Sequence, residues 1–174
     1  MTIPAVSNSR NQMLDEYTDR EQRQCNLILH NISESKTNEA TARKHANMDV
    51  VLNVVINGLK LNGITEADVT KLTRLSGRRS QGEGDKPRLI LIALSTAQLK
   101  WAILKRAKYL REIEHWMNIF MSPHLTHKER EAGKNLRAEL KRRRDEGEQN
   151  LAIRRNQVIT LKRENKIWQS VGTR

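Results

Sequence analysis

The chain has 174 residues, enough for one hydrophobic core or for one core with a small appendage. Its formal net charge of +12 and pI near 10.3 favour a polyanionic partner such as nucleic acid. The single cysteine, Cys25, excludes an internal disulfide and a cysteine-based zinc site, and it predicts an intracellular protein, cytoplasmic or nuclear. No stretch reaches the roughly 18 apolar residues of a membrane span, so we expect no membrane partner.

The first segment, residues 1–24, is polar. After Val6, its large apolar side chains are Met13, Leu14 and Tyr17, which are too few to form a buried stripe. We therefore predict a mobile tail that is partly helical over 1–24.

The next two segments predict a strand and a helix. Residues 25–32, CNLILHNI, alternate apolar and polar side chains, which is typical of a strand. Residues 39–61 carry an apolar stripe at helical spacing, and Asn62-Gly63 supplies a stop signal. The residues of this stripe are Met48, Leu52, Val55 and Leu59.

Two further strands are predicted on either side of a polar loop. Residues 69–75 alternate, and residues 88–94, RLILIAL, form a short apolar run of strand length. Between them, residues 76–87 hold three glycines, three basic residues and no apolar side chain, which predicts an exposed loop.

A second helix follows the third strand. Ser95 and Gln98 have the spacing of a capping box, so we expect a helix that runs to about Arg111. Trp101 and Trp116 are interpreted as core or core-edge residues. The inward residues are predicted to be Leu99, Ile103, Ala107 and Leu110, and the outward ones Lys100, Lys105, Lys108 and Arg111.

A fourth strand over residues 117–122 completes the order βαββαβ, which is typical of a ferredoxin-like domain. We therefore predict an α+β fold over 25–123: a four-stranded antiparallel sheet with both helices on one face, leaving the other face open. Single-stranded nucleic acid would bind on such an open face. Outward aromatics for base stacking are missing there, since the expected positions hold Ile28, Leu89 and Leu91.

The remaining residues, 124–174, predict a basic helix and a hairpin with a loose end. A capping box at Thr126 opens the helix, and Gly147 ends it. Residues 151–155 and 158–162 read as two short strands, with Asn156 at the turn. Residues 127–174 carry 14 basic and 7 acidic side chains. A basic stripe along the helix contains Arg130, Lys134, Arg137, Lys141 and Arg144.

Several segments together resemble the RNA-recognition-motif (RRM) region of first-open-reading-frame proteins of non-LTR retrotransposons of the long interspersed class, or a domesticated or stray copy. They are CNLILHNISES, KLTRLSGR, KPRLILIALSTAQLKWAILKRAK, NIFMSPHLTHKEREAGKNLRAELKRRRDEGEQN and LAIRRNQVI. The resemblance implies an RRM-like fold with a short C-terminal subdomain, and binding of single-stranded RNA or DNA in a retroelement ribonucleoprotein. It also implies a homotrimer through an N-terminal coiled coil, for which the polar tail here is short.

The candidate nucleic-acid-binding residues are cations and one histidine. Four of them lie in or beside the loop, and the others lie in the C-terminal helix and hairpin, where Lys141–Arg144 gives four consecutive cations. His30 is placed on the open sheet face. The full set is Arg78, Arg79, Lys86, Arg88, Arg137, Lys141, Arg142, Arg143, Arg144, Arg154, Arg155 and His30.

These patterns predict binding of single-stranded nucleic acid, RNA favoured over DNA, with low sequence specificity and mainly through phosphates. The alternative is an interaction or oligomerisation module whose aliphatic sheet face packs on a helix or on a second protomer. The sequence holds no phosphate-loop, HExxH or GxSxG motif, so we expect no enzyme, no cofactor and no metal site. His124 and His127 are interpreted as part of a capping loop.

Overall fold

The structure is a computed structural model that describes residues 5–75 and 87–161. The chain divides into two compact units, residues 1–126 and residues 127–174. Each unit has its own packing and is considered by itself. No helix within the described ranges is long and apolar enough to cross a membrane.

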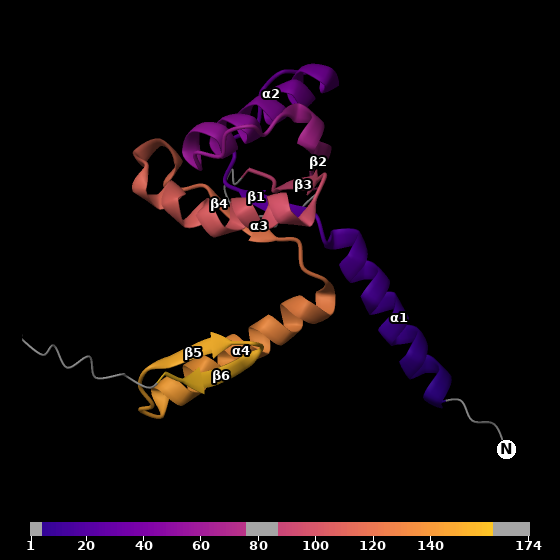
Figure 1. Ribbon diagram of the computed structural model, residues 1–174, viewed down its shortest axis with the longest axis vertical. Helices are drawn as coiled ribbons and strands as arrows, with labels where there is room; N and C mark the ends of the chain where they lie inside the picture. The colour runs from indigo at the N-terminus through magenta and orange to yellow at the C-terminus, as the bar shows by residue number, and fades with distance from the viewer. Residues whose placement is uncertain (1–4, 76–86, 162–174) are drawn as a thin grey trace, which may run out of the picture. The chain divides into compact units, whose positions relative to one another are not determined.

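Unit 1 contains a four-stranded antiparallel sheet whose strand order is β2-β3-β1-β4 (Figure 1). Strands β1 and β3 are therefore central. The helices α2 and α3 follow β1 and β3 in the chain, so the predicted α+β class and βαββαβ order are confirmed. The bounds are β1 Asn26–His30, α2 Ala40–Asn53, β2 Val69–Arg74, β3 Ile90–Leu94, α3 Ala97–Arg106 and β4 Phe120–Pro123.

The register of the sheet separates a helix-covered face from an open face. Leu27 of β1 pairs with Ile92 of β3, and both side chains are about 1% exposed. Because side chains alternate along a strand, Ile28 and its partner Leu91 lie on the opposite face. The hydrophobic core on the helix-covered face combines residues of the sheet with residues of both α2 and α3, so both helices cover the same face. It includes Leu27, Leu29, Ile90, Ile92, Leu94, Val51, Val54, Ile103 and Leu110.

The first predicted helix forms, but its last turn is π-helical. Helix α2 continues directly into the π-helical segment η1, Val54–Gly58, where the Leu59 N–H donates to the Val54 carbonyl oxygen at 3.0 Å. The wider turn places Val54 and Val55 together in the core, 1% and 4% exposed. Three residues of the predicted stripe, Met48, Val55 and Leu59, are buried, and the fourth, Leu52, is partly buried against the core.

Gly58 allows the end of this helix to approach the segment after α3 closely. A Cβ atom at this position would meet Leu110 Cδ2 at 2.8 Å and the Trp116 ring at 3.1 Å, and Leu110 is fully buried. We expect Gly58→Ala to lower the free energy of unfolding by about 1–2 kcal/mol, because overpacking outweighs the gain in helix propensity. Urea denaturation followed by circular dichroism measures this. Gly133→Ala, in the second unit, is the control, and an equally stable Gly58→Ala variant would contradict the packing argument.

The start of α3 differs from the prediction. The predicted Ser95–Gln98 capping box is wrong, because the N-cap is Thr96, whose Oγ1 accepts a hydrogen bond from the Leu99 N–H at 3.2 Å. The Ser95 hydroxyl instead donates to Asp68 Oδ1 at 3.4 Å. The α-helix ends at Arg106 and continues as the 3₁₀ segments η3, Ala107–Glu112, and η4, Glu114–Trp116.

Two side chains of α3 were assigned to the wrong environment: one that was predicted to be exposed is buried, and one that was predicted to be in or near the core is exposed. Lys100 was expected to point outward, yet it is 6% exposed, and its Nζ donates to the backbone carbonyl oxygen of Gln24 at 3.0 Å. Trp101 was expected in or near the core, yet it is 60% exposed. Lys100 is buried because it binds carbonyl groups at the C-terminal end of the first helix, an interaction between distant segments that the local pattern does not show.

That first helix, α1, spans Ala5–Arg23 and is longer than the partly helical tail that we predicted. Met13, Leu14 and Tyr17 remain exposed, as their number suggested. Polar contacts hold the C-terminal half of α1 in place: Arg23 Nη1 donates to the Leu125 carbonyl oxygen at 3.0 Å, and the buried Thr126 hydroxyl donates to Glu16 Oε1 at 2.6 Å. A helix held by polar groups has no apolar stripe by which to recognise it.

Unit 2 consists of α4, His127–Asp145, and a hairpin of β5, Leu151–Arg154, and β6, Gln157–Thr160. Figure 1 shows the hairpin folded back along α4. Arg155 and Asn156 form the two-residue turn, both with positive φ (48° and 57°), as a type I′ hairpin turn requires. The predicted turn at Asn156 is confirmed.

Candidate functional site

The basic stripe of α4 lies on the surface of unit 2. Its five residues, Arg130, Lys134, Arg137, Lys141 and Arg144, are all exposed. The adjacent face is half-buried at Leu136 and Leu140, and Leu151 at the start of the hairpin is 6% exposed. The helix thus packs through its narrow apolar face and presents cations to solvent.

Three of the four consecutive cations Lys141–Arg144 already have partners within unit 2. Arg142 forms ion pairs with Glu139 at 2.8 Å and with Glu146 at 2.5 Å. Arg143 pairs with Glu148 at 2.5 Å and donates to the Val158 carbonyl oxygen of β6 at 3.1 Å. The Arg143 guanidinium therefore joins α4 to the hairpin.

The titration behaviour of these groups follows from the same contacts. The hydrogen bonds that Arg142 donates to Glu139 and then to Glu146 raise the pKa of Arg142, and those to Glu139 lower the pKa of Glu139. The hydrogen bonds that Glu148 accepts from Arg143 likewise lower the pKa of Glu148. A phosphate that binds Arg142 or Arg143 would have to displace a carboxylate. Arg144 is engaged less strongly, through the Leu151 carbonyl oxygen at 3.4 Å.

Four other predicted cations of unit 2 are available to an external anion. Arg137, Lys141, Arg154 and Arg155 are exposed, and none forms a hydrogen bond or ion pair with another residue in the part of the chain that the structure describes. We call these four residues the open cations. Since no side chain of the described ranges must be displaced from them, they can approach a phosphate at little cost.

The predicted loop cations are placed only in part. Arg78, Arg79 and Lys86 lie outside the described residues. Arg88 lies two residues before β3 and is bound by Glu34: its Nη2 lies 2.7 Å from Glu34 Oε2, and its backbone N–H donates to Glu34 Oε1 at 2.9 Å. Arg88 is therefore part of an ion pair within unit 1.

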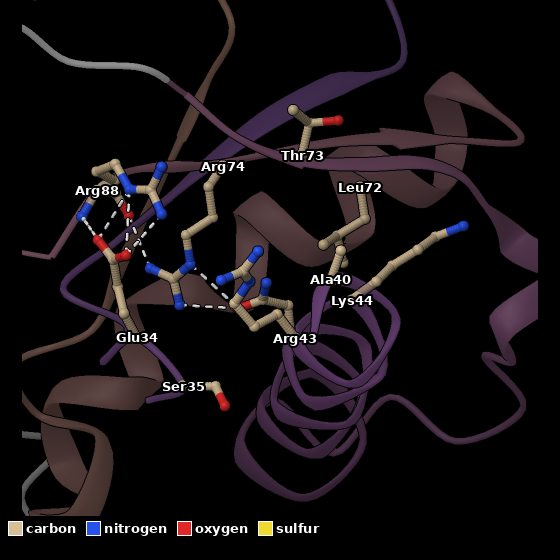
Figure 2. A pocket seen from close by; sticks show the side chains of 10 residues that line it. Glu34, Ser35, Ala40, Arg43, Lys44, Leu72, Thr73, Arg74 and Arg88 are labelled. Atoms are coloured by element: carbon tan, nitrogen blue, oxygen red, sulfur yellow. Dashed lines mark hydrogen bonds and ion pairs between the residues drawn. The ribbon is translucent and has the colours of Figure 1, made fainter. Parts of the chain in front are cut away.

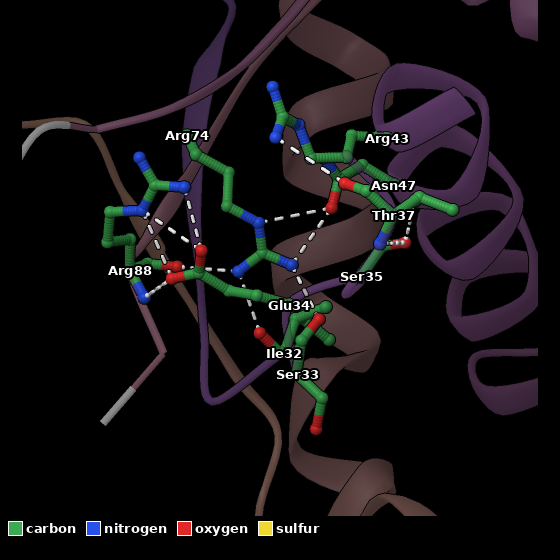
Figure 3. A network of polar contacts seen from close by, with 9 residues as sticks. All are labelled: Ile32, Ser33, Glu34, Ser35, Thr37, Arg43, Asn47, Arg74 and Arg88. Carbon is green, nitrogen blue, oxygen red and sulfur yellow. Dashed lines mark hydrogen bonds and ion pairs between the residues drawn. The ribbon is translucent and has the colours of Figure 1, made fainter. Parts of the chain in front are cut away.

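Arg74, at the end of β2, lies beside this pair and was not singled out from the sequence. Figure 3 shows its guanidinium between the loop after β1, helix α2 and the start of β3. Its Nη1 donates to the carbonyl oxygens of Ile32 at 2.7 Å and of Arg88 at 2.9 Å. Its Nη2 and Nε donate to the Ser33 carbonyl oxygen and to Asn47 Oδ1.

These five hydrogen bonds use all five N–H groups of the Arg74 guanidinium. Partial burial lowers the pKa of Arg74, yet none of its four acceptor atoms belongs to a carboxylate. Arg74 thus joins three segments of unit 1 and adds a positive charge that no direct ion pair cancels. No local sequence pattern signals this role, because its acceptors are up to 42 residues away.

A pocket of about 510 Å³ opens beside Arg74, between α2 and the edge strand β2. Figure 2 shows Glu34, Arg88 and Arg74 gathered at one end of the pocket, with Lys44 extending at the other. Arg43 and Lys44 come from the first turns of α2 and are exposed. Leu72 and Ala40 give the pocket an apolar wall.

The carboxylate of Glu34 makes the stability of this corner depend on pH. Hydrogen bonds from Arg88 lower its pKa from 4.5 to about 2. A carboxylate with a depressed pKa contributes its full stability above its unfolded pKa, near 4.5, and loses it as the pH falls toward about 2. We expect Glu34→Gln to destabilise the protein at neutral pH and the difference from wild type to shrink steadily between about pH 4.5 and about pH 2.

Urea denaturation over this pH range provides the measurement. Asp49→Asn is the matched control, because it removes an exposed carboxylate of α2 that has no ion pair within the described ranges. If the free energy of unfolding of Glu34→Gln differed from that of wild type by the same amount down to pH 2, the contact with Arg88 would contribute no stability that depends on ionisation.

The open face of the sheet contains an aromatic pair that the sequence analysis missed. The rings of His30 and Phe120 stack with a centroid distance of 4.0 Å and an interplanar angle of 13°. His30 Nε2 lies 2.9 Å from the Ser122 hydroxyl, and burial lowers the pKa of His30, which favours a neutral ring. Phe120 is 47% exposed. Residue 120 on β4 comes opposite residue 30 only through the strand register, which the sequence did not specify.

The positions of this face at which stacking aromatics were expected, Ile28, Leu89 and Leu91, are aliphatic, as predicted. Ile28 is buried, 7% exposed, and Leu89 is 36% exposed. The stacking surface therefore lies at the β4 edge and is absent from the centre of the described sheet face. Among the described residues, no three His, Cys, Asp or Glu side chains gather as they would around a metal ion.

A scan against protein-family models finds no matching family, and a search of curated proteins finds no similar sequence.

Proposed function

We propose that this chain binds single-stranded nucleic acid with low sequence specificity, mainly through phosphate contacts from Lys and Arg. The observation that carries the proposal is the set of open cations, Arg137, Lys141, Arg154 and Arg155. Residues 127–174 hold 14 basic and 7 acidic side chains, so the open cations add to a local excess of positive charge. Such a surface attracts a phosphate backbone whatever its base sequence.

The fold of unit 1 supports the same proposal. Its βαββαβ order and β2-β3-β1-β4 sheet are compatible with an RRM-like, ferredoxin-like domain, in which one sheet face is free to bind an unpaired strand. The resemblance to the retrotransposon proteins supports a preference for RNA and a place in a retroelement-type ribonucleoprotein. Aliphatic side chains at Ile28 and Leu91 favour phosphate contacts over base readout.

The experiment is a fluorescence-anisotropy titration of the full chain with labelled single-stranded RNA, single-stranded DNA and duplex DNA of matched length. We expect submicromolar to micromolar binding of both single strands and weaker binding of the duplex. Equal affinity for all three probes would indicate a general attraction to polyanions and would contradict single-strand binding.

The aromatic pair on the sheet gives a separate prediction. A base that stacks on Phe120 contributes about 1–3 kcal/mol. We therefore expect Phe120→Ala to weaken single-strand binding by about 5-fold to 150-fold, while the dependence of binding on salt stays unchanged because no phosphate contact is removed. Met117→Ala, which removes another exposed apolar side chain, is the control.

In the same titration, Met117→Ala should change the affinity by less than about twofold. Unaltered binding by Phe120→Ala would mean that the pair with His30 serves only the packing of the sheet. Phe120→Trp should restore binding, since a larger ring retains the stacking surface.

A protein-interaction module is the second candidate, and the exposed apolar side chains of Leu89 and Phe120 favour it. In that case a second protomer would cover the aliphatic sheet face. Size-exclusion chromatography with light scattering distinguishes the two candidate functions. A concentration-dependent dimer that nucleic acid leaves unchanged would support the interaction module.

A further inference from the structure

The pocket between α2 and β2 is a second place where an anion could bind, on the opposite edge of the sheet from the stacked rings. Strand β2 is one edge of the sheet, and β4, which carries Phe120, is the other. The residues that line the pocket belong to unit 1, whereas the open cations belong to unit 2. What it binds can therefore be considered apart from the proposed function.

The charge of the pocket favours an anion. Four cations line it, Arg43, Lys44, Arg74 and Arg88, and one carboxylate, Glu34, so the net charge of the lining is +3. Glu34 is fully engaged by Arg88. Arg74 donates its hydrogen bonds to neutral acceptors only, and the nearby Glu34 carboxylate, which forms its ion pair with Arg88, offsets part of the charge of Arg74.

Two of the cations have hydrogen-bond donors to spare. Arg43 makes a single long bond, from Nη1 to the Thr37 carbonyl oxygen at 3.4 Å, and Lys44 makes none with the described residues. Arg74, in contrast, has no N–H group left. Arg74 and the Arg88–Glu34 pair thus form a fixed wall, while Arg43 and Lys44 provide the donors that a ligand would meet (Figure 2).

The size and walls of the pocket indicate what kind of anion fits. A volume of about 510 Å³ is far larger than a single inorganic ion needs and lies within the range of small-molecule sites. Leu72 and Ala40 offer an apolar surface next to the cations, which suits a base or sugar. Guanidinium and ammonium groups together match the oxygens of a phosphate monoester.

We infer that this pocket binds a phosphate monoester of nucleotide size, with the phosphate on Arg43 and Lys44 and the nucleoside against Leu72. The ligand is either a free nucleotide or the phosphorylated end of a nucleic-acid strand. Both present the same chemistry to the pocket.

The test is an NMR titration of the full, amide-labelled chain with adenosine monophosphate, and with adenosine as the probe that lacks the phosphate. We expect adenosine monophosphate to shift the amide signals of residues 34–44 and 72–74, and adenosine to leave them in place. The double variant Arg43→Gln, Lys44→Gln should bind adenosine monophosphate at least tenfold more weakly. Lys105→Gln, Lys108→Gln makes the same charge change at two exposed lysines of α3 and η3 and should bind like wild type.

Two strands of one sequence, with and without a terminal phosphate, distinguish the sources. Shifts at the pocket with adenosine monophosphate and with the phosphorylated strand, but not with the unphosphorylated strand, assign the site to strand ends. Shifts with adenosine monophosphate but with neither strand assign it to free nucleotides. No shift with adenosine monophosphate, or equal loss of binding in both double variants, would overturn the inference. Charge reversal of the open cations should leave the binding of adenosine monophosphate intact. The test of this pocket is therefore independent of the test of single-strand binding by the open cations.

Discussion

Reversing the charge of the four open cations should abolish most binding of single-stranded nucleic acid. For the variant Arg137→Glu, Lys141→Glu, Arg154→Glu, Arg155→Glu, we expect a loss of about 100-fold or more at roughly 0.1 M salt, because four phosphate contacts disappear and four repulsive charges replace them. All four side chains are exposed and have no partner in the described ranges, so the reversals should leave the fold of unit 2 intact. Anisotropy titrations measure the affinity, and circular dichroism verifies the fold.

The matched control reverses four exposed cations of unit 1: Lys36, Lys105, Lys108 and Arg111. It changes the net charge by the same amount, so its affinity should fall much less than that of the first variant. Arg142→Gln should have little effect, since that guanidinium is already occupied by Glu139 and Glu146. If both variants with four charge reversals weakened binding equally, the affinity would come from charge spread over the whole chain, and the open cations would not form a specific binding surface.

Arg74→Met is expected to be the most destabilising of the substitutions considered, lowering the free energy of unfolding by about 2–3 kcal/mol. The change removes five hydrogen bonds and leaves three backbone carbonyl groups, of Ile32, Ser33 and Arg88, without this donor. Ile32 is a buried residue, and a buried acceptor that loses its donor costs about 1–3 kcal/mol, whereas solvent reaches Ser33 and Arg88. Urea denaturation measures the loss.

Two further variants show whether the hydrogen bonds are responsible. Arg43→Met removes a neighbouring but exposed arginine of α2 and should change the stability by less than about 0.5 kcal/mol. Arg74→Lys keeps the charge but cannot reproduce the planar set of five donors, so it should recover less than half of the lost stability. An Arg74→Lys variant as stable as wild type would assign the role of this residue to charge alone.

The architecture of unit 1 could be predicted because local patterns carry it. The alternation of Leu27 and Leu29 with Ile28 identifies both the strand and its buried side, and the spacing of Met48, Val55 and Leu59 identifies the helix face. The hairpin turn at Asn156 is equally local, since positive φ values favour asparagine there. In each case the signal lies within one element.

The parts that escaped prediction depend on contacts between distant segments. Lys100 is buried because it binds carbonyl groups near residue 24, and Arg74 because its acceptors lie in three different segments. Phe120 joins the sheet surface only through the register of β4 against β1. A sequence pattern read along one element has no information about such partners.

The candidate cations illustrate the same limit. The run Lys141–Arg144 suggested four equivalent ligands for phosphate, yet Arg142 and Arg143 are bound by carboxylates three to five residues away. Lys141 is the open cation of this run. The interface that we propose is thus smaller than the basic composition suggests, and it is centred on the hairpin turn and the exposed side of α4.

The most direct test of phosphate-driven binding is the dependence of affinity on salt. Each phosphate contact on a single strand contributes about −0.7 to the slope of log affinity against log salt, so the four open cations alone predict a slope near −3. The charge-reversed variant should retain only a small fraction of that slope. A wild-type slope near zero, with measurable affinity, would contradict the proposal that phosphates hold the strand.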